Sequence, residues 1–326
     1  MLFSTQFIDI DQFLEHIKIQ METDAVQLEA GPIQINSQLF MLSDVAISRY
    51  GASKKMFEKF CWPDNSTLIG FTPPKEGTGV IWCGITAPPD YVGILHSGME
   101  YSSLLLTGFD VVEVMVSNDL LAEYGLTNEK MWHKTKLPEQ AVFPLPNRRA
   151  VRFRNLLYSL FDNQTILELV QKNREITAYF REWVIEEIIA IVSECLSAEE
   201  PGLRLRKKSR HDIFQKALRL IDDQLKKPLS TGALALQLGS SPRVVQYAFQ
   251  ENLHMTPLQY ILTRKLHAAR TTLKNDFPDG RRSSVSDIAT LYNMSHFGRF
   301  SLQYKRLFGE SPSMTAKRTS SRHDQT

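Results

Sequence analysis

Arginines are clustered most densely at Arg148, Arg149, Arg152 and Arg154, within a part of the chain that is otherwise acidic. Arg148 and Arg152 are four residues apart and therefore share one face of a predicted helix. Guanidinium groups pair bidentately with phosphate or carboxylate, so these two arginines predict binding of an anionic small molecule. The alternative is that the cluster forms salt bridges with the acidic surface around it.

Residue patterns typical of catalysis are missing from the sequence. The N-terminal histidines are far apart and lack the H-x-H or H-E-x-x-H spacing of a metal site. Residues 77–79 (G-T-G) lack the third glycine of a dinucleotide-binding loop, and residues 96–98 (H-S-G) lack the leading glycine of a nucleophile elbow. We therefore expect no enzyme, no catalytic residue, no metal and no cofactor.

The net charge of +2 divides unevenly along the chain. Residues 203–326 hold 22 of the 38 Lys and Arg but only 9 of the 36 Asp and Glu, a balance of +13, which leaves −11 for the rest. A basic region attracts the phosphate backbone of nucleic acid through its long-range field. The charge therefore predicts nucleic-acid binding by the C-terminal region, with a solvated charged surface as the alternative.

Length and composition limit the classes of protein to which the chain can belong. At 326 residues the chain is long enough for two domains. It has no run of about 18 uncharged apolar residues, so we expect no membrane span and no membrane partner. The first twenty residues are amphipathic and acidic, unlike a signal peptide. The three scattered cysteines favour a reducing compartment, and we expect a cytoplasmic protein without disulfides.

Residues 230–249 predict a short helix, a tight turn and a second helix. Gly239 supplies the turn, because glycine reaches positive φ without strain. Ser241 is the predicted cap of the second helix, and Pro242 occupies its first turn. The predicted buried face consists of Leu234, Ala235, Leu238, Val244, Val245, Ala248 and Phe249.

Residues 284–308 repeat this plan, with a turn at Asn293 and Met294 and a predicted cap at Ser295. The predicted buried face consists of Ile288, Ala289, Tyr292, Phe297, Phe300, Tyr304 and Leu307. The second helix of a helix-turn-helix unit enters the major groove of DNA. Two such units in one small domain predict double-stranded DNA as the partner.

Two further helices are predicted around these units. One carries apolar residues at helical spacing from Ile213 to Leu225. The other begins at Pro257, is capped by Thr256, and continues to about Leu273. This long helix fixes the separation of the two helix-turn-helix units. These units should bind in successive major grooves, roughly 34 Å apart on one DNA face. A single chain then reads a long, non-palindromic half-site.

Many positions across both units match a known signature. In the first unit they are Ser241-Pro242-Arg243, Phe249, Thr256-Pro257-Leu258-Gln259-Tyr260 and Ala268-Ala269-Arg270. In the second they are Ile288-Ala289, Gly298-Arg299-Phe300-Ser301, Tyr304-Lys305 and Leu307-Phe308-Gly309-Glu310-Ser311-Pro312-Ser313. From about Asp212 to Ser313 the chain resembles the DNA-binding domain of the AraC/XylS family. The resemblance implies a bacterial transcription regulator with a ligand-sensing N-terminal domain. Activation, with a contact to RNA polymerase, is the expected output, and repression is the alternative.

The resemblance also implies which side chains contact DNA. Those expected to reach base edges are Arg243, Gln246, Tyr247, His296, Arg299 and Gln303, and those expected at phosphates are Ser241, Ser295, Lys305 and Arg306. Many family members carry Arg where Leu302 stands, so that contact is absent or is made by Gln303 or Lys305. Each of these residues is otherwise an ordinary solvated side chain.

Residues 1–146 predict a β-rich sensor domain, because short segments rich in β-branched and aromatic residues alternate with Gly, Pro, Asn and Asp. A leading helix is predicted over Phe7 to Met21, followed by a small cupin-like barrel or a sandwich. A barrel of this size holds a small ligand or is filled by its own side chains. Aromatic residues placed to line a pocket, or to pack in the core, are Trp62, Phe71, Trp82, Tyr91 and Tyr101.

Residues 147–202 switch to a helical period. Asn147 is the predicted cap of a helix over Arg148 to Asp162, and a longer helix is predicted from about Asn173 to Leu196. The wide apolar arc of the longer helix favours a homodimer seam, with burial inside its own domain as the alternative. Residues 203–316 then form the DNA-binding domain, and residues 317–326 a flexible tail.

Together these features predict an α+β protein with a β-rich barrel, a helical dimerisation segment and an all-α domain with two helix-turn-helix units. The predicted function is sequence-specific transcription regulation, controlled by a small-molecule effector. Two alternatives stay open. One is a DNA-binding protein without a ligand, regulated by its abundance or by a protein partner, and the other is an architectural DNA-binding protein.

Overall fold

The computed structural model describes residues 1–18, 21–74, 79–126, 142–197, 208–275 and 284–323. Contacts divide it into two compact units, residues 1–25 with 34–206 and residues 26–33 with 207–326. Residues 198–207, where the predicted helical segment meets the predicted DNA-binding domain, and residues 276–283, just before the second predicted helix-turn-helix segment, lie outside the described residues. No helix in the described ranges is long and apolar enough to cross a bilayer.

The first unit contains two sheets. The seven-stranded sheet has the order β1 (Leu2–Phe7), β3 (Ile35–Leu42), β4 (Val45–Ala52), β11 (Phe109–Ser117), β6 (Ser66–Phe71), β9 (Tyr91–His96) and β12 (Val142–Pro144). The five-stranded sheet has the order β2 (Thr23–Gln27), β5 (Met56–Cys61), β10 (Glu100–Leu105), β7 (Val80–Trp82) and β8 (Ile85–Thr86). No pairing among the described strands closes these sheets into the predicted barrel. The outer strands, β1 and β12 in one sheet and β2 and β8 in the other, each pair on one side only.

The helices of this unit lie mostly after the strands. They are α1 (Ile10–Ile17), α2 (Asn118–Glu123), α4 (Arg148–Asp162), α5 (Gln164–Lys172) and α6 (Arg174–Ser197). The predicted cap of α4 is confirmed, since the Asn147 side chain accepts a hydrogen bond of 3.0 Å from the amide of Ala150. The predicted leading helix is wrong at its start, because Phe7 ends β1 and the helix covers only Ile10–Ile17.

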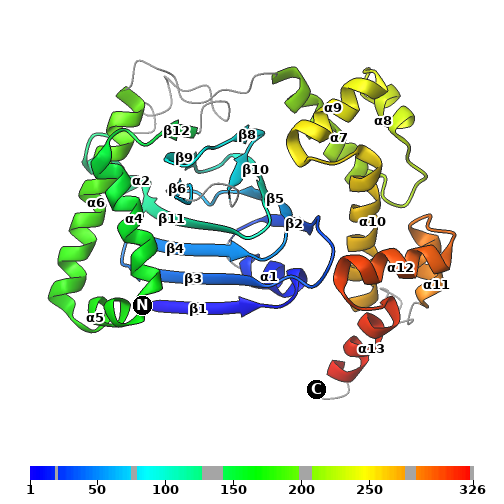
Figure 1. Ribbon diagram of the computed structural model, residues 1–326, viewed down its shortest axis with the longest axis horizontal. Helices are drawn as coiled ribbons and strands as arrows, with labels where there is room; N and C mark the ends of the chain where they lie inside the picture. The colour runs from blue at the N-terminus through cyan, green and yellow to red at the C-terminus, as the bar shows by residue number, and fades with distance from the viewer. Residues whose placement is uncertain (19–20, 75–78, 127–141, 198–207, 276–283, 324–326) are drawn as a thin grey trace. The chain divides into compact units, whose positions relative to one another are not determined.

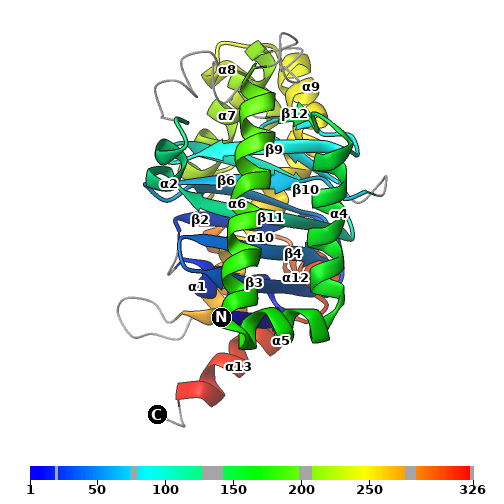
Figure 2. The ribbon, with the colours of Figure 1, turned by 90° about the vertical axis from the view of Figure 1, so that its left-hand side faces the viewer.

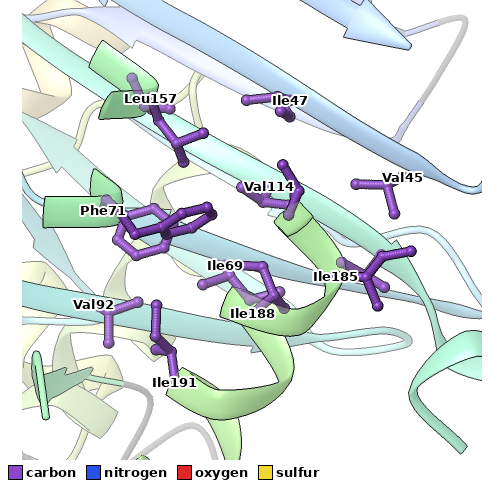
Figure 3. Close-up of a cluster of buried hydrophobic side chains, with 14 of the residues drawn as sticks. Val45, Ile47, Ile69, Phe71, Val92, Val114, Leu157, Ile185, Ile188 and Ile191 are labelled. Carbon is purple, nitrogen blue, oxygen red and sulfur yellow. The ribbon is translucent and has the colours of Figure 1, made fainter. Parts of the chain in front are cut away.

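The core of the first unit lies between the seven-stranded sheet and the helices. Because side chains alternate along a strand, one face of this sheet carries Ile47, Val114 and Ile69, which are paired side by side in register. Figure 2 shows α4, α5 and α6 lying across that face. Figure 3 shows Ile185 and Ile188 of α6 pointing at the same strand residues.

This packing accounts for much of the wide apolar arc of α6. Val184, Ile188 and Val192 have exposed fractions of 0%, so they are buried within their own unit. The ion pair of Glu187 with Arg149, at 2.9 Å, places even a charged residue in that interface. The homodimer seam stays a prediction, and the residue of α6 that supports it best is Tyr179, which is 78% exposed.

The second unit is helical. Its helices are α7 (Lys208–Asp223), α8 (Thr231–Gln237), α9 (Pro242–Leu253), α10 (Pro257–Lys274), α11 (Val285–Leu291), α12 (Phe297–Phe308) and α13 (Pro312–His323). Within this unit α9 lies beside one end of α10, and α12 lies beside the other (Figure 1). The segment predicted as a tail, residues 317–326, begins inside α13.

A short piece of N-terminal sequence, residues 26–33, also belongs to the second unit. The Gln27 side chain donates a 3.0 Å hydrogen bond to the carbonyl of Leu307, at the end of α12. The Gln27 carbonyl lies 3.0 Å from Nε2 of His267 on α10, and the Gly31 amide donates to the carbonyl of Arg306 at 2.9 Å. This segment therefore braces the end of the second helix-turn-helix unit.

Candidate nucleic-acid interface

The helix α9 is defined by local chemistry. The Ser241 side chain accepts a 3.3 Å hydrogen bond from the amide of Val244, and Pro242 occupies the first turn, as predicted. The exposed fractions of Val245, Ala248 and Phe249 are 0%. The opposite face of the helix is therefore presented outward, and it carries Arg243, Gln246 and Tyr247, all of them exposed.

The side chains of Arg243 and Tyr247 contact each other. The guanidinium of Arg243 donates to the hydroxyl of Tyr247 from Nε at 3.0 Å and from Nη2 at 2.8 Å, and its carbon lies 5.4 Å from the ring centroid. Arg210 of α7 also lies over this ring, at 5.0 Å, and pairs with Glu251. Tyr247 therefore orients two cations at the surface of the first helix-turn-helix segment.

The helix α12 repeats the arrangement with different details. Phe300, Tyr304 and Leu307 are buried, as predicted. His296 and Arg299 are exposed, and Gln303 is half-buried beside them. Lys305 and Arg306 are exposed in the last turn.

Two predictions about the start of α12 are wrong. The residue that precedes the helix is His296 rather than Ser295, and no side chain makes a capping hydrogen bond there. Phe297 is 48% exposed instead of buried. Because the helix starts two residues after Ser295, Phe297 falls in its first turn, outside the packed face. The amides of that first turn remain available to an anion such as phosphate.

Leu302 is the most exposed large apolar side chain on α12, with an exposed fraction of 70%. It lies three residues after Arg299 and four before Arg306, so the three share one helix face. An exposed leucine between two cations suits contact with the methyl group of thymine more than contact with phosphate. The departure from the family pattern therefore changes the chemistry of this position.

A buried network holds the second unit together. Arg270 of α10 is 4% exposed and pairs with Glu310 at 2.6 Å. Thr315 of α13 donates to the same Glu310 carboxylate at 2.9 Å and accepts from the hydroxyl of Tyr304 at 2.8 Å. The residues that gave the sequence its family resemblance at Arg270, Tyr304 and Glu310 are thus structural, because they join α10, α12 and α13.

The spacing of the two recognition helices depends on α10. Thr256 and Gln259 form a capping box at its start, and its 18 residues give a rod of about 27 Å at 1.5 Å per residue. Lys265 is a buried residue of this helix, and its side chain donates to the carbonyl of Lys227 at 3.0 Å. The separation of α9 and α12 by one turn of DNA stays a prediction.

The arginine cluster of the first unit divides into two pairs. Arg149 and Arg154 form ion pairs with Glu187 and Asp90, at 2.9 and 2.7 Å. Arg148 and Arg152 are exposed on α4. The structure therefore bears out the salt-bridge alternative for one pair only, and anion binding by the other pair stays a prediction.

A cavity of about 480 Å³ lies in the first unit, between the two sheets and against α1. Its apolar lining consists mainly of aromatic, leucine and methionine side chains, and Glu58 of β5 and Glu113 of β11 enter it from opposite sheets. Neither Arg148 nor Arg152 lines it. Sequence patterns did not reveal these two glutamates, because the signal of a charged residue at an inward strand position becomes visible only once the register is known.

Of the five aromatic residues proposed for a pocket, only Trp62 lines this cavity. Phe71 faces the helices and packs edge-on against Phe153, with centroids 5.7 Å apart. The Trp82 ring lies over Gly93, where an added Cβ would be 3.0 Å from it. Tyr101 packs behind the lining residue Phe60 without lining the cavity itself, and Tyr91 is half-buried at the start of β9.

Comparison with known proteins places the second unit in a recognisable group. A family model described as a helix-turn-helix domain matches residues 234–318. A XylDLEGF operon transcriptional activator of Pseudomonas putida is 36% identical over 105 residues, which are 32% of this chain and 31% of that protein. A second such activator from this species is 34% identical over 102 residues, 31% of this chain and 64% of that protein.

A probable thc operon regulatory protein of Rhodococcus erythropolis is 31% identical over 127 residues, which are 38% of each protein. The chain thus matches less than two thirds of the length of each of these relatives. Among solved structures, the AraC-like transcriptional activator CuxR aligns over 89% of this chain and 100% of its own, with 15% identity. The TM-score of this alignment is 0.41.

Proposed function

We propose that this chain, whose C-terminal domain belongs to the AraC/XylS family, is a transcription regulator that reads two successive major grooves of one DNA site. The named relatives are regulators of transcription rather than enzymes. One observation carries the proposal: two helices with exposed polar faces, α9 and α12, lie near the two ends of one capped rod. The basic balance of +13 over residues 203–326 supports it.

The two recognition faces have separate roles in this proposal. Arg243 and Gln246 suit guanine and adenine edges, and Arg299 suits guanine in the second groove. Tyr247, His296 and Gln303 complete the readout. Lys305 and Arg306, together with Ser241 at the start of α9 and Ser295 two residues before α12, hold phosphates and fix the register without reading sequence.

The N-terminal unit supplies control of DNA binding or of transcription. Its cavity has the volume of a small-molecule site. A ligand shifts DNA affinity or transcriptional output only if it stabilises one of two arrangements of the protein more than the other. The proposal includes a homodimer, contact with RNA polymerase and, by analogy with the operon activators among its relatives, activation.

The test is selection of bound sequences from a random DNA pool by the full chain. We expect an asymmetric half-site for each chain that extends over more than one helical turn, bound at least a thousandfold more tightly than random DNA at physiological salt. Similar affinity for every sequence would establish the architectural alternative. Repeating the selection with Arg243→Ala and with Arg299→Ala should relax the sequence preference at opposite ends of the site.

A further inference from the structure

On the basis of the proposed control by a small molecule, we propose that the cavity of the first unit binds an organic cation. Its ammonium or amidinium group would lie between the carboxylates of Glu58 and Glu113. Its apolar or aromatic body would lie against Phe13, Phe60 and Trp62. This inference assigns the chemical class of the effector, which neither the family nor the relatives supply.

The two carboxylates are held in place by neutral donors. The Ser48 hydroxyl donates to Oε2 of Glu113 at 3.1 Å, and the Tyr50 hydroxyl hydrogen-bonds to Glu58. Ser48 and Tyr50 are two residues apart on β4, so they point into the cavity from the same face. Each carboxylate is therefore oriented, but neither is neutralised.

Positive charge is scarce around this pair. Among the described residues that line the cavity there is no Lys or Arg, and His16 of α1 is the one side chain there that can become cationic. The nearest lysine in sequence, Lys59, alternates to the other face of β5 and pairs with Asp24 at 3.7 Å. Within the described part of the chain no ion pair forms with Glu58 or Glu113.

An apolar cavity with two unpaired carboxylates is costly for a protein that does not use them. Burial raises the pKa of Glu58 to about 8, with repulsion from Glu113 as the second cause, and burial raises the pKa of Glu113 to about 7. Apolar residues of similar volume would pack there without this penalty. A bound cation removes the penalty, because it pairs with the charged forms.

The rest of the lining indicates the shape of the ligand. Phe13, Phe60 and Trp62 provide aromatic faces, which attract both a cation and an apolar body. Trp62 is 6% exposed, and its indole Nε1 has no hydrogen-bond partner among the described residues. This buried donor suits an acceptor oxygen on the ligand. A volume of about 480 Å³ admits an arylalkyl ammonium ion.

The competing ligand classes fit this cavity less well. An anion would be repelled by the ionised forms of both glutamates, and a neutral molecule would leave those forms without a counter-charge. The anion-binding prediction concerned Arg148 and Arg152, whose side chains are exposed on α4 and do not line the cavity. An anionic effector would therefore have to bind elsewhere.

The experiment compares three probes of nearly equal shape on the full chain: 3-phenylpropylammonium, 3-phenylpropan-1-ol and 3-phenylpropanoate. Primary ammonium ions from butylammonium upward extend the series. We expect the ammonium ions alone to raise the melting temperature. Glu58→Gln and Glu113→Gln should each weaken binding of the best cation at least tenfold, and the double variant should abolish it. The matched control is Glu123→Gln, an exposed glutamate of α2, which should change nothing.

Three outcomes would overturn the inference. They are equal binding of the alcohol or the carboxylate, cation binding that survives in the double variant, and no response to any ammonium ion at millimolar concentration. Selectivity for DNA is measured on the same protein samples. If DNA selectivity persists without cation binding, only the ligand class is wrong. If cation binding persists without DNA selectivity, the proposed regulator function is wrong.

Discussion

At the scale of single residues, the most informative feature is the pairing of Arg243 with Tyr247. Two hydrogen bonds and the ring contact hold the guanidinium at the surface before DNA arrives. Ordering a long side chain in advance reduces the entropy lost on binding. Tyr247 therefore has two roles in the proposal, as a base-reading residue and as the support of its neighbour.

We predict that Arg243→Ala lowers affinity for the selected site by about 1–3 kcal/mol and largely spares binding to random DNA. Tyr247→Phe keeps the ring and removes the hydroxyl acceptor, so its loss should be smaller and in the same direction. Fluorescence anisotropy with both DNAs measures these differences. Equal losses on the selected site and on random DNA would show that Arg243 contacts only phosphate.

A second residue-scale prediction concerns pH and the two cavity glutamates. Their pKa values in the folded protein, about 8 and about 7, lie above the ordinary 4.5. The folded state therefore binds more protons than the unfolded state between these values, and this contribution to stability is complete below pH 4.5 and is lost as pH rises toward 8. Neutral glutamine does not titrate.

The free energy of unfolding of the double variant Glu58→Gln/Glu113→Gln should therefore increase relative to that of the wild type as pH rises from about 5 to about 8. Urea denaturation at several pH values measures the difference. His96 and His211, whose pKa values burial lowers, titrate in both proteins and cancel in the comparison. A difference that stays constant with pH would show that the carboxyls ionise normally.

At the scale of elements, the two recognition helices begin differently. Ser241 caps α9 through the amide of Val244, whereas α12 has no side-chain cap and Ser295 lies outside it. We predict that Ser241→Ala destabilises the protein by about 1 kcal/mol, while Ser295→Ala leaves stability nearly unchanged. Chemical denaturation of the two variants provides a matched comparison. Equal losses in the two variants would contradict the difference in capping.

Sequence predicted those elements whose chemistry is local. The caps at Asn147, Ser241 and Thr256 and the buried faces of α9 and α12 follow from residues within one or two turns of each other. The start of α12 did not follow, because the turn before it is fixed by packing and no capping side chain marks it. The short helix α5 was missed because it lies between two longer helices of the same period.

Features that depend on pairing between residues distant in the sequence could not be predicted from sequence patterns. The inward direction of Glu58 and Glu113 depends on strand register in two different sheets. The closure of a barrel depends on edge strands that periodicity cannot pair. The assignment of residues 26–33 to the second unit depends on backbone and side-chain hydrogen bonds from Gln27 and Gly31, which leave no periodic signal.

At the scale of the whole molecule, charge is divided between the regions of the chain. The +13 balance of residues 203–326 attracts DNA, and the −11 balance of the remainder does not. Each phosphate contact releases condensed counterions, so the logarithm of affinity falls linearly with the logarithm of salt concentration. Phosphate contacts can therefore be counted independently of base contacts.

We predict that Lys305→Ala and Arg306→Ala each reduce, by about one, the magnitude of the slope of the logarithm of DNA affinity against the logarithm of salt concentration. Each variant should lose a similar amount of affinity for all DNA sequences. Arg152→Ala is the matched control, since it removes an exposed cation from the acidic region and should leave the slope unchanged. Anisotropy titrations from about 50 to 200 mM salt provide the slopes. If Lys305 or Arg306 instead reads bases, its variant keeps the slope and loses affinity only for the selected site. A slope that changed in the control would mean that the acidic region itself contacts DNA, and the division of charge between the regions would then have no role in DNA binding.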